Sequence, residues 1–319
     1  MVIVNGRVMA LAGMLLLAGC SSDVHASSAA APSPLVTSSA ATTPAATSRG
    51  VYVALGDSYT AAPGVPDQTG NPSGCERSSG NYPNLVAAAL GLASSQLVDV
   101  SCSGATIADL TGSQDTGNGV NPAQLDALSA DDAIVTLGIG GNDIDFSGIL
   151  TRCVELDMVP SLIGSSASGS TPCEAYFTSG GVNQIDQKIQ NASTSLASAL
   201  RKIAQRAPHA RVYVVGYPDL LPSGGSTCGR TLGITPGDLT FLNEEELRLN
   251  AMLSRQAGAV GAHYVDTYTS SQGHDACSGT DTRWIEPLLP SSASAPMHPN
   301  ARGEQGMAAA ALAAIKNVA

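Results

Sequence analysis

The chain has 319 residues, and 43% of them are hydrophobic, which is enough for the core of one large domain or two small ones. Its 15 Lys and Arg against 26 Asp and Glu give a net charge of −11, and such a surface repels the phosphate backbone of a nucleic acid. Aromatic residues make up only 4%, too few for a platform that stacks bases. We therefore expect no nucleic-acid partner, and no apolar run reaches the ~18 residues of a membrane-spanning helix.

The first 20 residues have the pattern of an export signal. Arg7 supplies the positive charge, residues 8–18 are a short apolar stretch, and Leu-Ala-Gly precedes Cys20. Small residues before a cysteine resemble the bacterial lipobox, in which the cysteine is diacylated and becomes the mature N-terminus. The resemblance implies that the protein is exported and held to the outer face of the cell membrane by a lipid on Cys20. The alternative is simple secretion after cleavage near Ala26.

Residues 21–49 have the composition of a flexible tether. Ser, Thr, Ala and Pro account for 23 of these 29 residues, and no apolar face recurs along them. Such a segment buries too little surface to offset the entropy lost on ordering. We therefore place the folded domain at residues 50–319.

Within this domain, short apolar runs alternate with helical periodicity. The runs predicted as strands are 51–55, 97–101, 133–137, 212–215 and 264–266. The segments predicted as helices are 82–92, 122–128, 180–207, 238–258 and 300–315. The alternation predicts a parallel sheet with helices on both faces. Long connections rich in Gly, Ser and Pro are expected at 60–80, 146–180, 217–237 and 268–297.

Six cysteines remain in the folded domain, and an even count in an exported chain predicts three disulfides. Six cysteines allow fifteen pairing patterns. We favour sequential pairing, because each bridge then closes one excursion of the chain: Cys75–Cys102, Cys153–Cys173 and Cys228–Cys277. No CxxC or Cys/His spacing suggests zinc, so we expect no metal site.

Polar residues and glycines follow the predicted strands. The first strand runs into Gly-Asp-Ser-Tyr at 56–59, Gly104 follows the second, and Gly-Gly-Asn-Asp at 140–143 follows the third. His298 precedes the last predicted helix. Because ligands bind at the carboxyl ends of the strands in open α/β sheets, we expect these four blocks to meet on one rim.

In their order and spacing, the four blocks resemble those of the GDSL or SGNH hydrolases, over residues 50–319 as a whole. The cysteine-bearing loops are similar to those of the secreted actinobacterial esterase, lipase and phospholipase branch. The resemblance implies a flavodoxin-like three-layer α/β/α sandwich with a five-stranded parallel sheet of order 2-1-3-4-5. It also implies that Ser58 is the nucleophile and His298 the general base. The backbone N–H groups of Ser58 and Gly104 and the side chain of Asn142 would form the oxyanion hole.

The chemistry of these residue types agrees with the implied roles. A serine hydroxyl is a weak nucleophile until a base takes its proton, and histidine has a suitable pKa near neutrality. The developing oxyanion needs preorganised donors, and a glycine at 104 lets the backbone approach the substrate closely. A Cys75–Cys102 bridge, which ends two residues before Gly104, would hold that donor in place.

One position departs from the family pattern. Many relatives carry an Asp three residues before the histidine as the third member of a triad, and this chain has Ala295 there. We therefore predict a Ser-His dyad in which the backbone carbonyl of Ala295 orients His298. A carbonyl fixes the tautomer of the ring, although it stabilises the imidazolium less than a carboxylate does.

Several other polar residues could have a role at the site or a purely structural role. His274 is a rival base, because it lies in a loop expected on the rim. We expect Asp57 to brace its own turn, Asp143 to cap the helix that follows it, and Asp266 to cap a helix or turn. The three glutamates at 244–246 read as a solvated helix face.

The sequence thus predicts a monomeric serine esterase or lipase that hydrolyses carboxylic acyl esters of small molecules or lipids without a cofactor. Two alternatives use the same scaffold. One is a polysaccharide O-deacetylase or an acyltransferase, which would use the same residues. The other is a non-catalytic binding lipoprotein, which would have no need of all four blocks.

Overall fold

The computed structural model describes residues 50–162, 170–222 and 232–317. In these residues, five parallel strands form the central sheet: β1 (Val51–Gly56), β2 (Leu97–Asp99), β5 (Asp132–Gly138), β6 (Arg211–Val215) and β7 (His263–Val265). The strand order is β2-β1-β5-β6-β7. This is the predicted order 2-1-3-4-5 for the five predicted strands, so the flavodoxin-like α/β expectation is confirmed.

The two faces of the sheet bury different cores, because successive side chains of a strand point to opposite faces. In β1, Tyr52 and Ala54 belong to one apolar cluster, and Val53 and Leu55 belong to the other. All four side chains are fully buried. Strand β1 is therefore covered on both faces, which explains its continuous apolar sequence.

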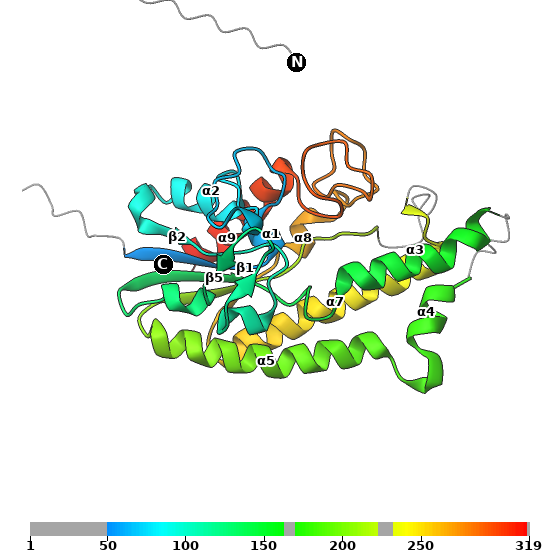
Figure 1. The fold of residues 1–319 in the computed structure, drawn as a ribbon, viewed down its shortest axis with the longest axis horizontal. Coiled ribbons are helices and arrows are strands. Elements are labelled where there is room, and N and C mark those ends of the chain that lie inside the picture. Colours follow the sequence, from blue (N-terminus) through cyan, green and yellow to red (C-terminus); the bar gives the residue numbers. More distant parts are fainter. Residues whose placement is uncertain (1–49, 163–169, 223–231, 318–319) are drawn as a thin grey trace, which may run out of the picture. The chain divides into compact units, whose positions relative to one another are not determined.

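Helices cover both faces of the sheet (Figure 1). Helices α2 (Tyr82–Ala89) and α9 (Ala301–Asn317) lie on one face, and α5 (Gln184–Arg206) and α7 (Pro236–Ala259) lie on the other. Two single-turn helices, α1 (Ser58–Ala61) and α8 (Tyr268–Ser271), follow strands β1 and β7. These helices complete the three-layer sandwich.

The segment 146–180, expected as a long connection, contains two helices. They are α3 (Phe146–Leu162) and α4 (Pro172–Phe177). Ile149 and Leu150 lie four and three residues before Cys153, and all three are buried, as on one face of a helix. The prediction of a loop was wrong, because the Gly, Ser and Pro that suggested it are concentrated beyond residue 159.

The remaining elements are short. A hairpin pairs β3 (Gln114–Asp115) with β4 (Val120–Asn121). The 3₁₀ turns are η1 (Ser73–Cys75), η2 (Ser94–Gln96), η3 (Ile107–Leu110), η4 (Gln124–Ala127) and η5 (Ser179–Gly181). The helix predicted at 122–128 is therefore the single 3₁₀ turn η4.

Two of the predicted disulfides lie in the described residues and form as predicted. One joins Cys75 to Cys102, and the other joins Cys153 in α3 to Cys173 in α4. Cys228 and Cys20 lie outside the described residues, so the third pairing and the lipid anchor stay predictions. No helix of the described residues is long and apolar enough to cross a membrane.

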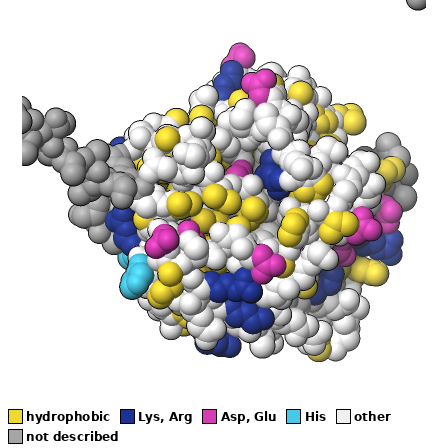
Figure 2. Space-filling model, turned by 60° about the vertical axis from the view of Figure 1, so that its left-hand side comes forward, with side chains coloured by type: hydrophobic (Ala, Val, Ile, Leu, Met, Phe, Trp, Pro, Cys, Tyr) yellow, Lys and Arg dark blue, Asp and Glu magenta, His cyan; other side chains and the backbone are white. Residues whose placement is uncertain are grey.

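The surface mixes charges of both signs. On the face drawn in Figure 2, basic and acidic side chains are interspersed, and a row of hydrophobic side chains lies in a hollow across the middle.

Candidate active site

Ser58 lies just beyond the carboxyl end of strand β1, as the first residue of α1. Asp57 caps this helix, because its Oδ1 accepts the N–H of Tyr59 at 2.9 Å. The sharp exit from the strand requires glycine at position 56, where φ is +154° and an added Cβ would lie 2.3 Å from Oγ1 of Thr60. The local sequence thus turns the chain abruptly and places the Ser58 hydroxyl at the edge of the sheet.

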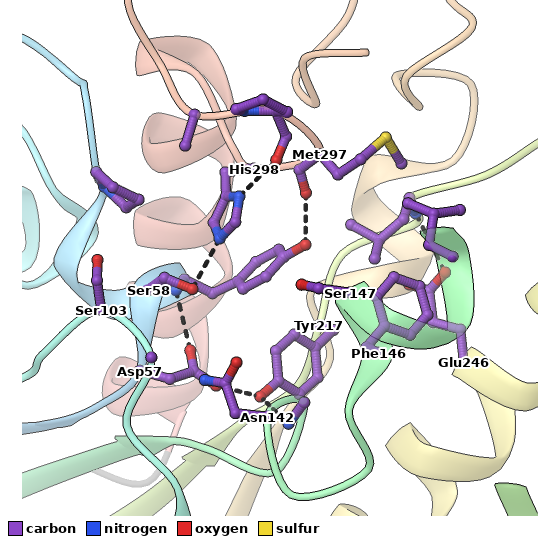
Figure 3. A pocket seen from close by; sticks show the side chains of 18 of the residues that line it. Asp57, Ser58, Ser103, Asn142, Phe146, Ser147, Tyr217, Glu246, Met297 and His298 are labelled. Carbon is purple, nitrogen blue, oxygen red and sulfur yellow. Dashed lines mark hydrogen bonds between the residues drawn. The ribbon is translucent and has the colours of Figure 1, made fainter. Parts of the chain in front are cut away.

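His298 is delivered by the loop before α9, and its Nε2 lies 2.7 Å from Oγ of Ser58. Its Nδ1 faces the backbone carbonyl of Pro296 at 2.7 Å (Figure 3). The prediction that Ala295 orients the ring was therefore wrong by one residue. Met297 adopts a left-handed conformation with φ of 58°, which turns the Pro296 carbonyl toward the ring, while the Ala295 carbonyl accepts the backbone N–H of His298.

Burial lowers the pKa of His298 below its ordinary value of 6.5. The hydrogen bond to the Pro296 carbonyl and the negative charge of Glu76 oppose this shift without reversing it. A neutral imidazole can accept a proton at pH 7, whereas an imidazolium cannot. With Nδ1–H donated to Pro296, the free lone pair is on Nε2, which faces the Ser58 hydroxyl.

Gly104 and Asn142 lie on the same cavity as Ser58. Gly104 has a φ of +78°, and the nearest atom to an added Cβ is Nε2 of Gln114 at 3.6 Å, so glycine is required there by backbone conformation rather than by space. Nδ2 of Asn142 donates one N–H to the carbonyl of Ala105 at 2.9 Å. Since a side-chain amide has two donors, the second N–H of Asn142 is available to a ligand.

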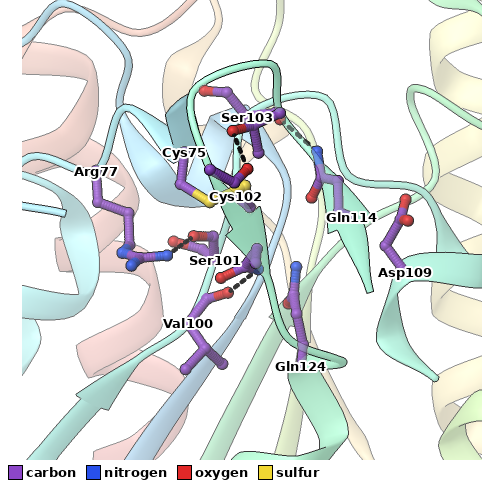
Figure 4. The surroundings of a disulfide bond; sticks show 12 residues. Cys75, Arg77, Val100, Ser101, Cys102, Ser103, Asp109, Gln114 and Gln124 are labelled. Atoms are coloured by element: carbon purple, nitrogen blue, oxygen red, sulfur yellow. Dashed lines mark hydrogen bonds between the residues drawn. A yellow bond between two sulfur atoms is a disulfide. The ribbon is translucent and has the colours of Figure 1, made fainter. Parts of the chain in front are cut away.

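The loop that carries Gly104 is braced by the Cys75–Cys102 disulfide (Figure 4). The backbone N–H of Ser103 donates to the carbonyl of Cys75 at 3.0 Å, and Nε2 of Gln114 donates to the carbonyl of Ser103 at 2.8 Å. The backbone N–H and the backbone carbonyl of Ser103, the residue before Gly104, are thus both held by hydrogen bonds.

The acidic residues near the rim hold backbone rather than histidine. Asp57 braces its turn as predicted, and burial raises its pKa to about 7. Asp143 was expected to cap the following helix, but its carboxylate accepts the N–H of Ile107 at 3.1 Å, and burial raises its pKa to about 6. Asp266 caps a turn as predicted, since it accepts the N–H of Thr269 at 2.9 Å.

Ser58, Gly104, Asn142 and His298 line a cavity of ≈ 400 Å³ (Figure 3). One end holds the Ser58–His298 pair, and the walls away from it are mostly apolar. The apolar walls are contributed by Phe146 and Leu150 of α3, Leu249 of α7, and Leu220 and Leu288 of loops. We did not predict the α3 residues, although the helical spacing of apolar residues after 146 was a usable signal.

The glutamates of α7 contradict the expected solvated face. Glu245 and Glu246 are each only 2% exposed, and Glu246 lines the cavity. The carboxyl of Glu246 accepts the N–H of Leu220 at 3.3 Å. Burial, together with the nearby charge of Asp219, raises the pKa of Glu246 well above its ordinary value.

The rival base, His274, does not line the cavity. Its Nδ1 faces the carbonyl of Thr282 at 2.6 Å, and its ring stacks on Trp284 with centroids 4.4 Å apart. These contacts give His274 a structural role in the rim loop. Among the described residues, no cluster of three or more His, Cys, Asp or Glu side chains could hold a metal ion.

Comparison with known sequences agrees with this site. The sequence model of the GDSL-like lipase/acylhydrolase family matches residues 54–305, which include all four blocks. The chain belongs to this family. It is therefore a carboxylic ester hydrolase, and Ser58, Gly104, Asn142 and His298, one from each of the four blocks, line one cavity.

Characterised relatives extend over most of the chain. Lipase 2 of Streptomyces coelicolor is 42% identical over 260 residues, which cover 81% of this chain and 83% of the relative. An esterase of Streptomyces scabiei is 33% identical over 262 residues, which cover 75% and 76%.

Two crystal structures share the fold. Phospholipase A1 from Streptomyces albidoflavus superposes with a TM-score of 0.67 at 28% identity, over 85% of this chain and 100% of the other. An extracellular lipase from Streptomyces rimosus gives 0.66 at 26% identity, over the same shares of the two chains.

Proposed function

We propose that Ser58 and His298 form a catalytic dyad that hydrolyses esters of aliphatic carboxylic acids. The observation that carries the proposal is the 2.7 Å contact between Nε2 of His298 and Oγ of Ser58, on a cavity with apolar walls. The family of the chain supplies the reaction class, and the geometry supports an assignment of roles.

In the first half of the reaction, Oγ of Ser58 bonds to the ester carbonyl carbon as its proton passes to Nε2 of His298. The bond to the alcohol oxygen then breaks, and the alcohol leaves with the proton from His298. In the second half, water attacks the acyl-enzyme, again giving its proton to His298, and the carboxylic acid is released. The Pro296 carbonyl holds the ring in the tautomer that both halves require.

The backbone N–H groups of Ser58 and Gly104 and the amide of Asn142 stabilise the oxyanion of both tetrahedral intermediates. Each such donor contributes about 2.7–4 kcal/mol to the transition state, because it is already oriented when the charge develops. This contribution does not depend on a carboxylate as the third member of a triad, so a dyad with a complete oxyanion hole is sufficient.

The size of the cavity favours an aliphatic acyl chain over an acetyl group. An acetyl group has about the volume of two water molecules, roughly 60 Å³ in total, and would leave most of the ≈ 400 Å³ cavity empty. Each additional buried CH₂ contributes about 0.8 kcal/mol to binding. The lipases and the phospholipase A1 among the relatives agree with a long acyl group.

The cellular location follows from the N-terminal pattern. The protein is exported through its signal peptide, residues 1–20, and held by a lipid on Cys20, with residues 21–49 as the tether. The extracellular lipase among the structural relatives supports export. A Cys20→Ser variant should leave the membrane fraction with its esterase activity intact, and continued membrane association would contradict the anchor.

The activity is tested with p-nitrophenyl esters from acetyl to decanoyl, comparing wild type with Ser58→Ala and Ser147→Ala. Ser147 is the matched control, because its hydroxyl also lines the cavity. We expect kcat/KM to rise with chain length, Ser58→Ala to be inactive, and Ser147→Ala to retain turnover. Preference for acetyl esters would favour a deacetylase, transfer to an added alcohol would favour an acyltransferase, and an inactive wild type would favour a binding protein.

A further inference from the structure

The candidate site is assembled from three segments that lie far apart in the sequence. Ser58 follows β1, Gly141 and Asn142 follow β5, and His298 lies in the loop before α9. All of them lie beyond the ends of the strands, where the sheet hydrogen bonds have stopped. Two backbone hydrogen bonds still join them, from the N–H of Asp57 to the carbonyl of Gly138 at 2.9 Å and from the N–H of Ala295 to the carbonyl of Pro63 at 3.0 Å. Side chains add further links.

Tyr217, which follows β6, connects two of these segments. Its hydroxyl donates a hydrogen bond to Oδ2 of Asp57, the residue before Ser58, and accepts the N–H of Gly141 at 2.7 Å (Figure 3). The backbone of Tyr217 is itself held on both sides by Asn250, which accepts its N–H at 2.8 Å and donates to its carbonyl at 2.9 Å. Tyr217 is only 4% exposed, so water does not compete for these bonds.

Tyr59 connects the nucleophile turn to the histidine segment. Its hydroxyl donates to the carbonyl of Met297 at 2.6 Å, and its ring stacks on His298 with centroids 4.9 Å apart. The Tyr59 ring also packs edge to face against the ring of Tyr217, with centroids 5.0 Å apart and an interplanar angle of 83°. The two tyrosines thus contact each other and reach all three segments.

We propose that the hydroxyls of Tyr217 and Tyr59 are positioning groups, which hold the oxyanion segment and the histidine segment in register with Ser58. This inference rests on the proposed dyad. Neither hydroxyl takes part in the bond changes: Tyr217 acts through Asp57 and Gly141, and Tyr59 acts through Met297.

The proposal predicts which kinetic constant changes. The apolar walls that bind the acyl chain come from α3, α7 and loops, and a Tyr→Phe change leaves the ring in place. Substrate binding in the ground state should therefore persist. A displacement of about 1 Å between reacting groups lowers turnover by as much as about 100-fold, so the loss should appear in kcat rather than in KM.

The test measures kcat, KM, the pH profile and thermal stability for Tyr217→Phe and Tyr59→Phe, with Tyr52→Phe as the matched control. Tyr52 is fully buried and its hydroxyl lies 3.0 Å from Oγ1 of Thr136, but it does not line the cavity. We expect kcat to fall about 10- to 100-fold in both site variants with KM within about threefold of wild type. The control should keep wild-type kcat. Tyr59→Phe should also move the acid limb of the pH profile, because the lost hydroxyl no longer holds the carbonyl of Met297, the residue before His298.

Wild-type kcat in both site variants would overturn the proposal. So would an equal fall of kcat in the Tyr52→Phe control, since that result would show a general effect of lost stability. Failure of the proposed function gives a different result, namely absent ester hydrolysis in the wild type or full activity in Ser58→Ala. If a Phe variant does not accumulate, the rate at which an organophosphonate labels Ser58 is measured in Tyr217→Trp and Tyr59→Trp. Slower labelling in these variants supports the proposal, and an unchanged rate overturns it.

Discussion

Replacing Asn142 by Ala removes one proposed donor of the oxyanion hole while leaving the Ser58–His298 pair untouched. The side chain donates one N–H to the Ala105 carbonyl at 2.9 Å, and its second N–H is free for the substrate oxyanion. Loss of an oxyanion donor costs about 2.7–4 kcal/mol in the transition state, which is about 10²- to 10³-fold in kcat. Loss of the bond to Ala105 costs only about 1 kcal/mol of stability. The variant should therefore fold and bind substrate but turn over slowly.

The assay compares kcat, KM and the urea midpoint of Asn142→Ala with those of Asn121→Ala. Asn121 is the matched control, because its amide also donates to a backbone carbonyl, that of Val100 at 3.3 Å, but it does not line the cavity. Both variants should lose similar stability, and only Asn142→Ala should lose turnover. Asn142→Asp, which presents an oxygen in place of the donor, should be slower still. A kcat for Asn142→Ala within threefold of wild type would refute the assignment.

Three further predictions concern charge. The proposed dyad has no carboxylate partner for His298. Asp143→Asn, Asp266→Asn and Asp275→Asn, the last in the rim loop, where its Oδ1 accepts the N–H of Cys277 at 2.7 Å, should therefore each retain turnover, and a folded variant with a loss of about 10⁴-fold would identify an acid that supports His298. Because burial lowers the pKa of His298 and the base must be neutral, kcat/KM should fall with acid only below pH 6.5, and a limb centred above pH 7 would be inconsistent with this base. The pKa of Asp57 is raised from 3.8 to about 7, so the folded state binds more protons than the unfolded state; its stabilisation is complete below pH 3.8 and is lost as pH rises through about 7. Urea midpoints should therefore be higher at about pH 5 than at about pH 8, and the reverse order would contradict the shift.

Much of the fold was predictable because the strands are marked twice, by apolar runs and by the glycines that end them. Gly56, the last residue of β1, and Gly140, two residues after the end of β5, both adopt positive φ, so the sequence itself indicates where the chain leaves the sheet. The rule that ligands bind at strand ends then placed the four blocks together. The same rule pointed to Tyr217, two residues after β6, and we did not apply it there.

Other features depend on tertiary packing that a single sequence does not display. Glu245 and Glu246 are charged residues that read as exposed, yet neighbouring segments cover them and their pKa values rise. The carbonyl that orients His298 depends on the left-handed backbone of Met297, a conformation that methionine rarely adopts. No local pattern distinguishes Pro296 from Ala295 in that role.

The central claim is that Ser58 is the residue that carries the acyl group. Wild-type protein is mixed with a p-nitrophenyl ester, quenched in acid during turnover, and analysed by intact mass and peptide mapping. The account predicts one added acyl group on the peptide that contains Ser58. In the His298→Gln variant, this adduct should form slowly or not at all. An acyl group on Ser103 or Ser147, the other serines that line the cavity, would contradict this account. So would undiminished turnover of the Ser58→Ala variant without any covalent adduct.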